Sequence, residues 1–179
     1  MVELRLLNGK EELSVKVGDI SNCEMQKLLE FAEKDERFGV AFFGALSQIR
    51  HRIYLESLGF HVSESQSDNL GAPDFIIAGQ YTLEHKRAKK NTYSDGSLKA
   101  EFQKSRGIVP DRLYDSSFSD IVSADVSEHT GVKNDYRYAL TEDLRKHHDY
   151  TDKIASIQKI NEKWTNDLRS LMEVVSESR

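Results

Sequence analysis

Three side chains in the stretch GAPDFIIAGQYTLEHKRAKK, residues 71–90, could carry chemistry: Asp74, Glu84 and Lys86. The segments that contain them are otherwise short and apolar. Their pattern predicts two β-strands, DFIIA and YTLEHKRA, joined by a turn at Gly79. The charged residues are therefore expected on strands rather than on an exposed loop.

The two strands should bring the three charged groups together. Because residues two apart in a strand point to the same face, Glu84 and Lys86 should project together, while Leu83 and His85 face the other side. Asp74 lies ten residues before Glu84. An antiparallel hairpin centred on residue 79 therefore places Asp74 beside Glu84.

Two carboxylates and an ammonium group at one point suit a particular chemistry. The carboxylates repel each other unless a cation lies between them, and their oxygens suit a hard divalent ion such as Mg²⁺. The ammonium of Lys86 can orient or help deprotonate a water, and it can offset the charge that builds on a phosphate under attack. These are the groups that phosphodiester hydrolysis needs.

Pro73-Asp74 followed by Glu84-His85-Lys86 resembles the signature of the PD-(D/E)XK phosphodiesterase superfamily, which includes type II restriction endonucleases and Holliday-junction resolvases. The resemblance covers roughly residues 38–125. It implies a mixed sheet flanked by helices, with Mg²⁺ as the working ion, for which Mn²⁺ can substitute. It also implies that Asp74 and Glu84 are metal ligands, the backbone carbonyl of His85 is a further ligand, and Lys86 is the catalytic lysine.

Other residues could assist this set. The family often places a glutamate on the helix before the first strand, where this chain has Gln48. A glutamine brings no charge, which argues against a two-ion mechanism. Glu101 and Gln103 form a competing ExQ pair, which ranks lower because no tight hairpin links it to Asp74.

Charge is distributed unevenly along the chain. The formal net charge is −5, but residues 86–112 contain eight Lys and Arg against three Asp and Glu and so carry +5. A basic segment beside an acidic remainder can steer one surface toward phosphates, and the family resemblance implies double-stranded DNA as the partner. The alternative is a solvated charged loop. The residues expected to contact DNA are Arg87, Lys89, Lys90, Lys104 and Arg106.

Composition narrows the setting. Cys23 is the only cysteine, which excludes an internal disulfide and a cysteine zinc site and fits a reducing cytoplasm. No apolar run approaches the roughly 18 residues of a membrane span, and the N-terminus lacks signal-peptide features, so we expect a cytoplasmic protein without a membrane partner. His147 and His148 should point about 100° apart on a helix, as a solvent-exposed pair rather than a metal site.

The elements of the first half follow from periodicity. An Asn-Gly pair between alternating runs predicts a hairpin over residues 2–17. Residues 22–35 predict a helix with Asn22 as its cap. A longer helix follows and ends at Gly59, and it is expected to bury Phe42, Leu46, Ile49 and Ile53.

The second half is less regular. Residues 96–107 are ambiguous between helix and strand, FSDIVSADVS and DYRYAL predict strands, and TEDLRKH predicts a helix that begins at a capping Thr141. An apolar stripe predicts an amphipathic helix over residues 151–177, formed by Ile154, Ile157, Ile160, Trp164, Leu168, Leu171 and Val175.

These elements predict one α/β domain over residues 1–179, with a mixed central sheet flanked by helices and with residues 1–36 and 151–177 as additions to a nuclease-like core. The function predicted is a Mg²⁺-dependent restriction-type endonuclease, either a homodimer or a catalytic subunit beside a larger recognition subunit. The alternatives are a Holliday-junction resolvase, or a DNA-binding or assembly protein whose site has decayed. In the last case the three charged residues would form a structural ion-pair network.

Overall fold

The structure is a computed structural model that describes residues 3–8, 11–16, 21–65, 72–88, 92–104 and 108–179. The chain divides into two compact units, Met1–Phe43 and Gly44–Arg179. Helix α2 (Glu36–Ser57) contributes residues to both units. The candidate site lies entirely in the second unit.

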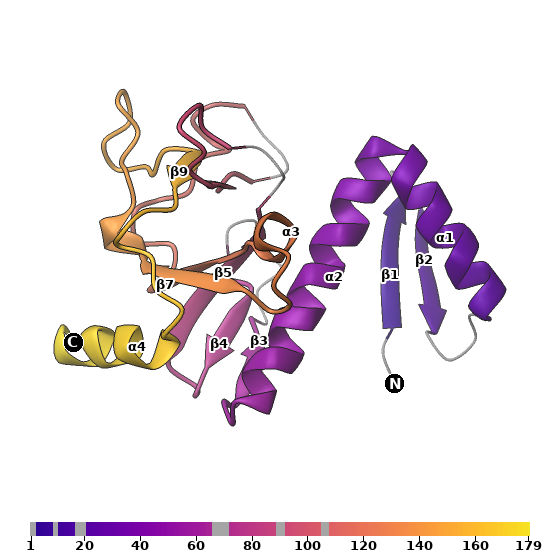
Figure 1. The fold of residues 1–179 in the computed structure, drawn as a ribbon, viewed down its shortest axis with the longest axis horizontal. Helices are drawn as coiled ribbons and strands as arrows, with labels where there is room; N and C mark the ends of the chain where they lie inside the picture. The colour runs from indigo at the N-terminus through magenta and orange to yellow at the C-terminus, as the bar shows by residue number, and fades with distance from the viewer. Residues whose placement is uncertain (1–2, 9–10, 17–20, 66–71, 89–91, 105–107) are drawn as a thin grey trace. The chain divides into compact units, whose positions relative to one another are not determined.

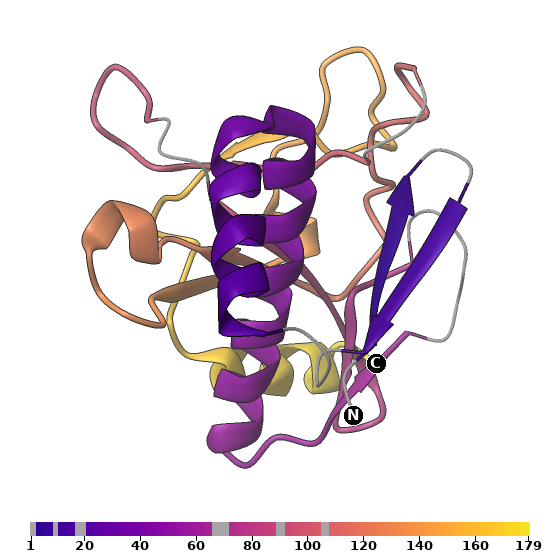
Figure 2. The same ribbon diagram turned by 90° about the vertical axis from the view of Figure 1, so that its right-hand side faces the viewer.

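The first unit begins with the predicted hairpin. Strands β1 (Glu3–Asn8) and β2 (Glu11–Lys16) pair antiparallel, with Asn8 opposite Glu11 (Figure 2). Helix α1 (Asn22–Lys34) follows. Its N-cap is Ser21 and not Asn22 as predicted, because Ser21 and Glu24 exchange side-chain-to-backbone hydrogen bonds in a capping box.

The second unit is built on a five-stranded mixed sheet, shown in Figure 1. Its strands lie in the order β3 (Val62–Glu64), β4 (Phe75–Ile77), β5 (Tyr81–Arg87), β7 (Ile121–Asp125) and β8 (Tyr136–Leu140). Strands β5 and β7 are parallel and the other neighbours are antiparallel. The α/β class with a mixed central sheet and flanking helices is confirmed in this unit.

A separate hydrophobic cluster packs on each face of the sheet. On one face, Leu55 of α2 and Leu168 of α4 (Leu168–Glu177) pack with strand residues such as Ile121 and Tyr138. The neighbouring strand residues Val122 and Ala139 point to the other face, as the two-residue period requires. There they pack with Phe102, Tyr114, Ile154 and Trp164.

The second face is covered by irregular chain and by a two-stranded ribbon. Strand β6 (Lys99–Glu101) pairs antiparallel with β9 (Ile157–Lys159). The ambiguous residues 96–107 therefore include a strand. A one-turn helix α3 (Ser127–Thr130) connects β7 to β8.

Helix α2 turns a different face inward from the one predicted. Ile49 is 42% exposed and Ile53 is 60% exposed, whereas Ser47, His51 and Leu55 are buried. These three residues are four apart and line one side of the helix. Apolar periodicity failed because polar residues of the sheet offer hydrogen-bond partners to Ser47 and His51.

The C-terminal prediction was also wrong in part. The helix over residues 151–177 begins only at Leu168, because the preceding residues form turns and strand β9. Ile154 and Trp164 are buried all the same, from irregular chain. Thr141 begins a three-residue 3-10 helix (Thr141–Asp143) without a side-chain cap, rather than a longer helix.

In the ranges that the structure describes, no helix combines the length and the apolar character that crossing a membrane requires.

Candidate functional site

The β4–β5 hairpin positions the site. Phe75 pairs with Leu83 and Ile77 with Tyr81, so the predicted register about residue 79 is confirmed. Gly79 has φ of +75°, the left-handed conformation that favours glycine in a tight turn. This register sets Asp74, one residue before β4, against the strand that carries Glu84.

Asp74 is tied to two other elements. Its Oδ2 accepts a hydrogen bond from the backbone N–H of His85 at 2.8 Å. Its Oδ1 accepts one from Nε2 of Gln48, on helix α2, at 2.6 Å. The residue expected in place of the family's helix glutamate therefore does lie against Asp74.

Glu84 is 1% exposed, and its two oxygens differ sharply. Oε1 accepts from Nζ of Lys86 at 2.5 Å and from the hydroxyl of Tyr114 at 2.6 Å. Oε2 is buried and has no hydrogen-bond partner among the described residues. A buried carboxylate oxygen without a donor is costly, so this atom requires an explanation.

Burial and neighbouring charges shift the pKa values of this group. Burial, followed by repulsion from Glu84, raises the pKa of Asp74 to about 7, although Lys86 and the hydrogen bonds to His85 and Gln48 oppose the change. Burial disfavours the charged form of Lys86, but attraction by Glu84 and Asp74 outweighs it and raises the pKa of that ammonium. Lys86 is therefore a cation in this site.

Sequence reasoning missed Tyr114. It lies 30 residues beyond Glu84, in the irregular chain between β6 and β7, and it is 5% exposed. Its ring stacks on Phe118 with centroids 4.2 Å apart. No spacing rule links so distant a tyrosine to the hairpin, and its contact with Glu84 follows only from the tertiary fold.

The face of β5 opposite Glu84 holds a buried polar network. Nε2 of His85 lies 2.9 Å from Oγ of Ser47, and Nδ1 lies 2.8 Å from Oγ of Ser123. Ser47 donates its one proton to Asp125 at 2.9 Å, so the Nε2 of His85 must be the donor to Ser47. Burial, aided by repulsion from Lys86, lowers the pKa of His85 to about 3, so the ring is neutral.

His51 extends this network. Its Nε2 lies 3.0 Å from the hydroxyl of Tyr138, and its ring lies 4.4 Å from that of His85, centroid to centroid. Burial, followed by repulsion from His85, holds its pKa well below the ordinary value. These residues explain the inward face of α2, and they pack behind the carboxylates rather than beside them.

The competing acid-amide pair forms a local unit. Nε2 of Gln103 donates a hydrogen bond to Glu101, at the end of β6. Gln103 and Lys104 lie in the irregular chain after β6, within the segment whose sequence was ambiguous between helix and strand. Nζ of Lys104 lies 5.9 Å from the ring centroid of Tyr114, and Nζ of Lys86 lies 5.5 Å from it, which places both cations near the same ring.

Arg87, Lys89, Lys90 and Arg106 are the other residues expected to contact DNA. Arg87 donates hydrogen bonds to Glu128 and is partly exposed. Lys89, Lys90 and Arg106 lie outside the described residues. Their expected contacts with DNA stay predictions.

Two further clusters lie away from the hairpin. His147, His148 and Asp149 bring their potential ligand atoms within 4.8 Å of one another, and the two imidazole rings stack 4.7 Å apart. The predicted divergence of the two histidines was wrong because residues 144–149 do not form a helix. His148 and Asp149 are exposed, which leaves the group without a buried ligand that needs a cation.

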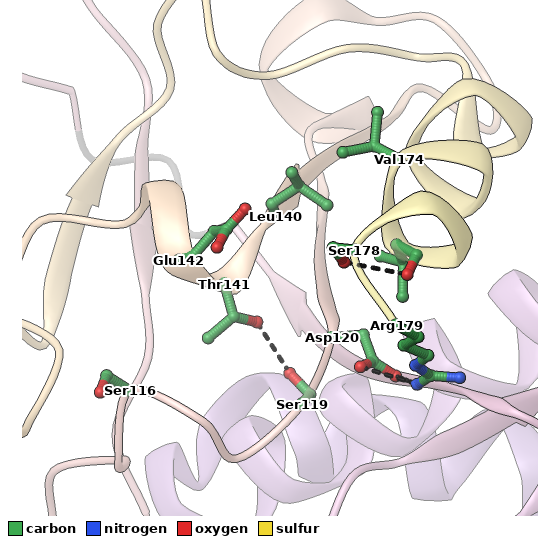
Figure 3. Close-up of a pocket in the computed structure, with 10 residues that line it drawn as sticks. Ser116, Ser119, Asp120, Leu140, Thr141, Glu142, Val174, Ser178 and Arg179 are labelled. Atoms are coloured by element: carbon green, nitrogen blue, oxygen red, sulfur yellow. Dashed lines mark hydrogen bonds and ion pairs between the residues drawn. The ribbon is translucent and has the colours of Figure 1, made fainter.

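A pocket of about 190 Å³ opens between the end of β8 and helix α4 (Figure 3). Asp120 and Arg179 line it together with Thr141 and Glu142 and several serines. The Arg179 guanidinium donates to both oxygens of the Asp120 carboxylate at 2.9 Å, and dashed lines mark this contact in Figure 3. None of Asp74, Glu84 and Lys86 contributes to its lining.

Comparison with known proteins places few limits on the chain. No protein-family model matches it, and no curated protein matches it. Among solved structures, a bacterial homing endonuclease, I-Ssp6803I, matches with a TM-score of 0.48 and 14% identity, over 76% of this chain and 95% of that chain. A likeness of this degree assigns neither family nor function, which must come from the chain's own side chains.

Proposed function

We propose that the chain is a Mg²⁺-dependent endonuclease that hydrolyses DNA phosphodiester bonds. The observation that supports this best is Oε2 of Glu84, a buried carboxylate oxygen without a donor among the described residues, close to Asp74, whose pKa is raised to about 7 by burial and by repulsion from Glu84. An ion-pair network alone would be expected to pair this oxygen, because buried carboxylate oxygens are usually hydrogen-bonded. A divalent cation would satisfy it and would remove the repulsion between the two carboxylates.

The donor set fits such an ion. Asp74 and Glu84 would hold it, and the backbone carbonyl of His85 would be a further oxygen ligand. When bound, Mg²⁺ supplies positive charge that polarises a phosphoryl oxygen. Two carboxylates suit one Mg²⁺ ion, and Gln48, which gives its amide to Asp74, adds no third charge.

Lys86 has a separate task in this proposal. Its raised pKa keeps it protonated, so it acts as a hydrogen-bond donor and a fixed positive charge and not as a base. Its side chain is 24% exposed, which allows contact with an incoming phosphate. From there it can orient the attacking water and stabilise charge on the phosphate in the transition state.

Double-stranded DNA is the proposed substrate because Lys86 and Lys104 both lie near the Tyr114 ring, in a segment of net positive charge. A restriction role, and assembly as a homodimer or beside a larger recognition subunit, belong to the same proposal. A cytoplasmic location also stays a prediction.

The test is a cleavage assay on plasmid and phage DNA with Mg²⁺ or Mn²⁺, with the protein alone and with candidate partner subunits. We expect metal-dependent cutting that Asp74→Ala and Lys86→Ala each slow by about 10²-fold or more. Cutting at the wild-type rate in both variants would place the active site elsewhere. No cutting under any of these conditions would favour the assembly protein instead.

A further inference from the structure

Tyr114 makes a contact that the proposed chemistry does not yet explain. Its hydroxyl donates to Oε1 of Glu84, the same oxygen that receives the ammonium of Lys86. One oxygen of this carboxylate thus has two donors, and the other has none among the described residues. Such an uneven distribution fixes which oxygen can meet a further positive charge.

The fold holds the tyrosine in place independently of Glu84. The backbone carbonyl of Tyr114 accepts a hydrogen bond from the N–H of Ile154 at 3.0 Å. The next residue, Asp115, forms a β-bridge with Lys153. With the ring stacked on Phe118, both the main chain and the side chain are anchored, so the hydroxyl is a pre-positioned donor.

We infer that Tyr114 is a positioning residue for the metal ligand Glu84, whose Oε1 it occupies so that Oε2 is presented to a divalent cation. This inference rests on the proposed function. A hydrogen bond from a fixed donor selects one orientation of a carboxylate, and it does so before the ion arrives. Without it, Glu84 would be held only by Lys86, a long and flexible side chain.

The arrangement also concerns Lys86. If Lys86 turns from Glu84 toward a phosphate, Oε1 loses one of its two donors. The hydroxyl of Tyr114 remains, so Glu84 keeps its orientation while the lysine acts on the substrate. Tyr114 thereby separates the task of holding the ligand from the task of contacting DNA.

The hydroxyl can be removed with little change in packing. Tyr114→Phe keeps the ring that stacks on Phe118 and deletes only the donor to Glu84. Tyr81→Phe is the matched control, because Tyr81 is also buried and its hydroxyl lies 2.5 Å from Oγ of Ser176, away from the carboxylates.

The experiment is calorimetric titration of Mn²⁺ into the full chain without DNA, for the wild type, Tyr114→Phe, Tyr81→Phe and Glu84→Gln. We expect Tyr114→Phe to raise the Kd for Mn²⁺ about 10- to 100-fold, the effect usual for groups that orient a metal ligand. Tyr81→Phe should stay within about twofold of the wild type.

The outcomes separate the two ideas. A wild type that binds no Mn²⁺, or a Glu84→Gln variant that binds it normally, overturns the proposed function. A wild type and Tyr114→Phe with equal Kd values overturn the role of Tyr114 and leave the nuclease proposal standing. A Tyr114→Phe protein that fails to fold also counts against this role, since the hydroxyl would then serve the fold and not the orientation of Glu84.

Discussion

Two carboxylates, Glu84 in strand β5 and Asp120, which accepts hydrogen bonds from that strand, differ in how completely their oxygens are paired. Asp120 accepts from the backbone N–H and the hydroxyl of Thr82 at 2.7 and 2.8 Å, and both of its oxygens meet Arg179 (Figure 3). Glu84 is more deeply buried, yet one of its oxygens has no donor among the described residues. The fully paired group lines the pocket, and the incompletely paired group does not.

The pKa values show the same contrast. Burial opposes the charge of Asp120, but hydrogen bonds from Thr82 and Arg179 outweigh it and lower the pKa. For Asp74 the balance goes the other way, because its own burial, followed by repulsion from Glu84, raises its pKa to about 7. If Glu84 is a metal ligand as proposed, its unpaired oxygen, and not the pocket beside Asp120, is the place for the cation.

The largest effect should come from Lys86. We expect Lys86→Ala to lower the rate of DNA cleavage at saturating metal by about 10²- to 10³-fold, because a fixed charge at the phosphate is lost. Single-turnover rates measure this. The control is Lys163→Ala, which removes an exposed lysine paired with Asp143 and should cut at the wild-type rate. Equal losses in both variants would contradict the assignment.

Metal binding should depend on pH through Asp74. A carboxyl group with a pKa of about 7 is mostly protonated at pH 6 and mostly ionised at pH 8, and only the ionised form holds a cation. The Kd for Mg²⁺, measured by calorimetry, should therefore fall about tenfold from pH 6 to pH 8. Asp120→Asn should keep this dependence. A flat profile in the wild type would show that Asp74 is not a ligand.

Asp120 offers the converse test. We expect Asp120→Ala to lower the free energy of unfolding by about 1–2 kcal/mol, because Thr82 and Arg179 lose their acceptor at a partly exposed position. Metal affinity and cleavage rate should be unchanged at a temperature where the variant is folded. Urea unfolding measures the first and calorimetry the second. A loss of metal binding would mean that this ion pair belongs to the site.

The smallest effect should come from Gln48. Gln48→Glu adds a third carboxylate against Asp74, so we expect the Kd for Mg²⁺ at pH 8 to fall about threefold to tenfold. Gln48→Met, which removes the amide without adding charge, is the control and should not bind more tightly. A weaker affinity in the glutamate variant would place this side chain outside the reach of the ion.

The sequence predicted the hairpin well because its determinants are local. The turn at Gly79 and the two-residue period of β5 are enough to set Asp74, Glu84 and Lys86 on one side of the sheet. The strands themselves were predictable for the same reason, whereas the mixed pairing of the sheet was expected from the resemblance to the PD-(D/E)XK superfamily. Local signals determined the register of the hairpin, and the register determined where the two carboxylates lie.

Other features depend on partners that no local signal reveals. The inward face of α2 carries the polar residues Ser47 and His51 because the sheet offers them hydrogen-bond partners. These partners are Asp125, His85 and Tyr138. The apolar stripe over residues 151–177 predicted a helix, but its members Ile154 and Trp164 are buried while lying in irregular chain. Tyr114 reaches Glu84 only because its loop is pinned to Ile154.

His85 joins the two faces of the sheet through a single residue. Its main-chain N–H grips Asp74, while its imidazole is wedged between Ser47 and Ser123 on the far side. A shift of the imidazole ring would displace the His85 backbone N–H and change the orientation of the Asp74 carboxylate. The two buried serines, which no nucleic acid could contact, thus hold the carboxylate of Asp74 in position through His85. Substitutions of these serines should change metal affinity as well as stability.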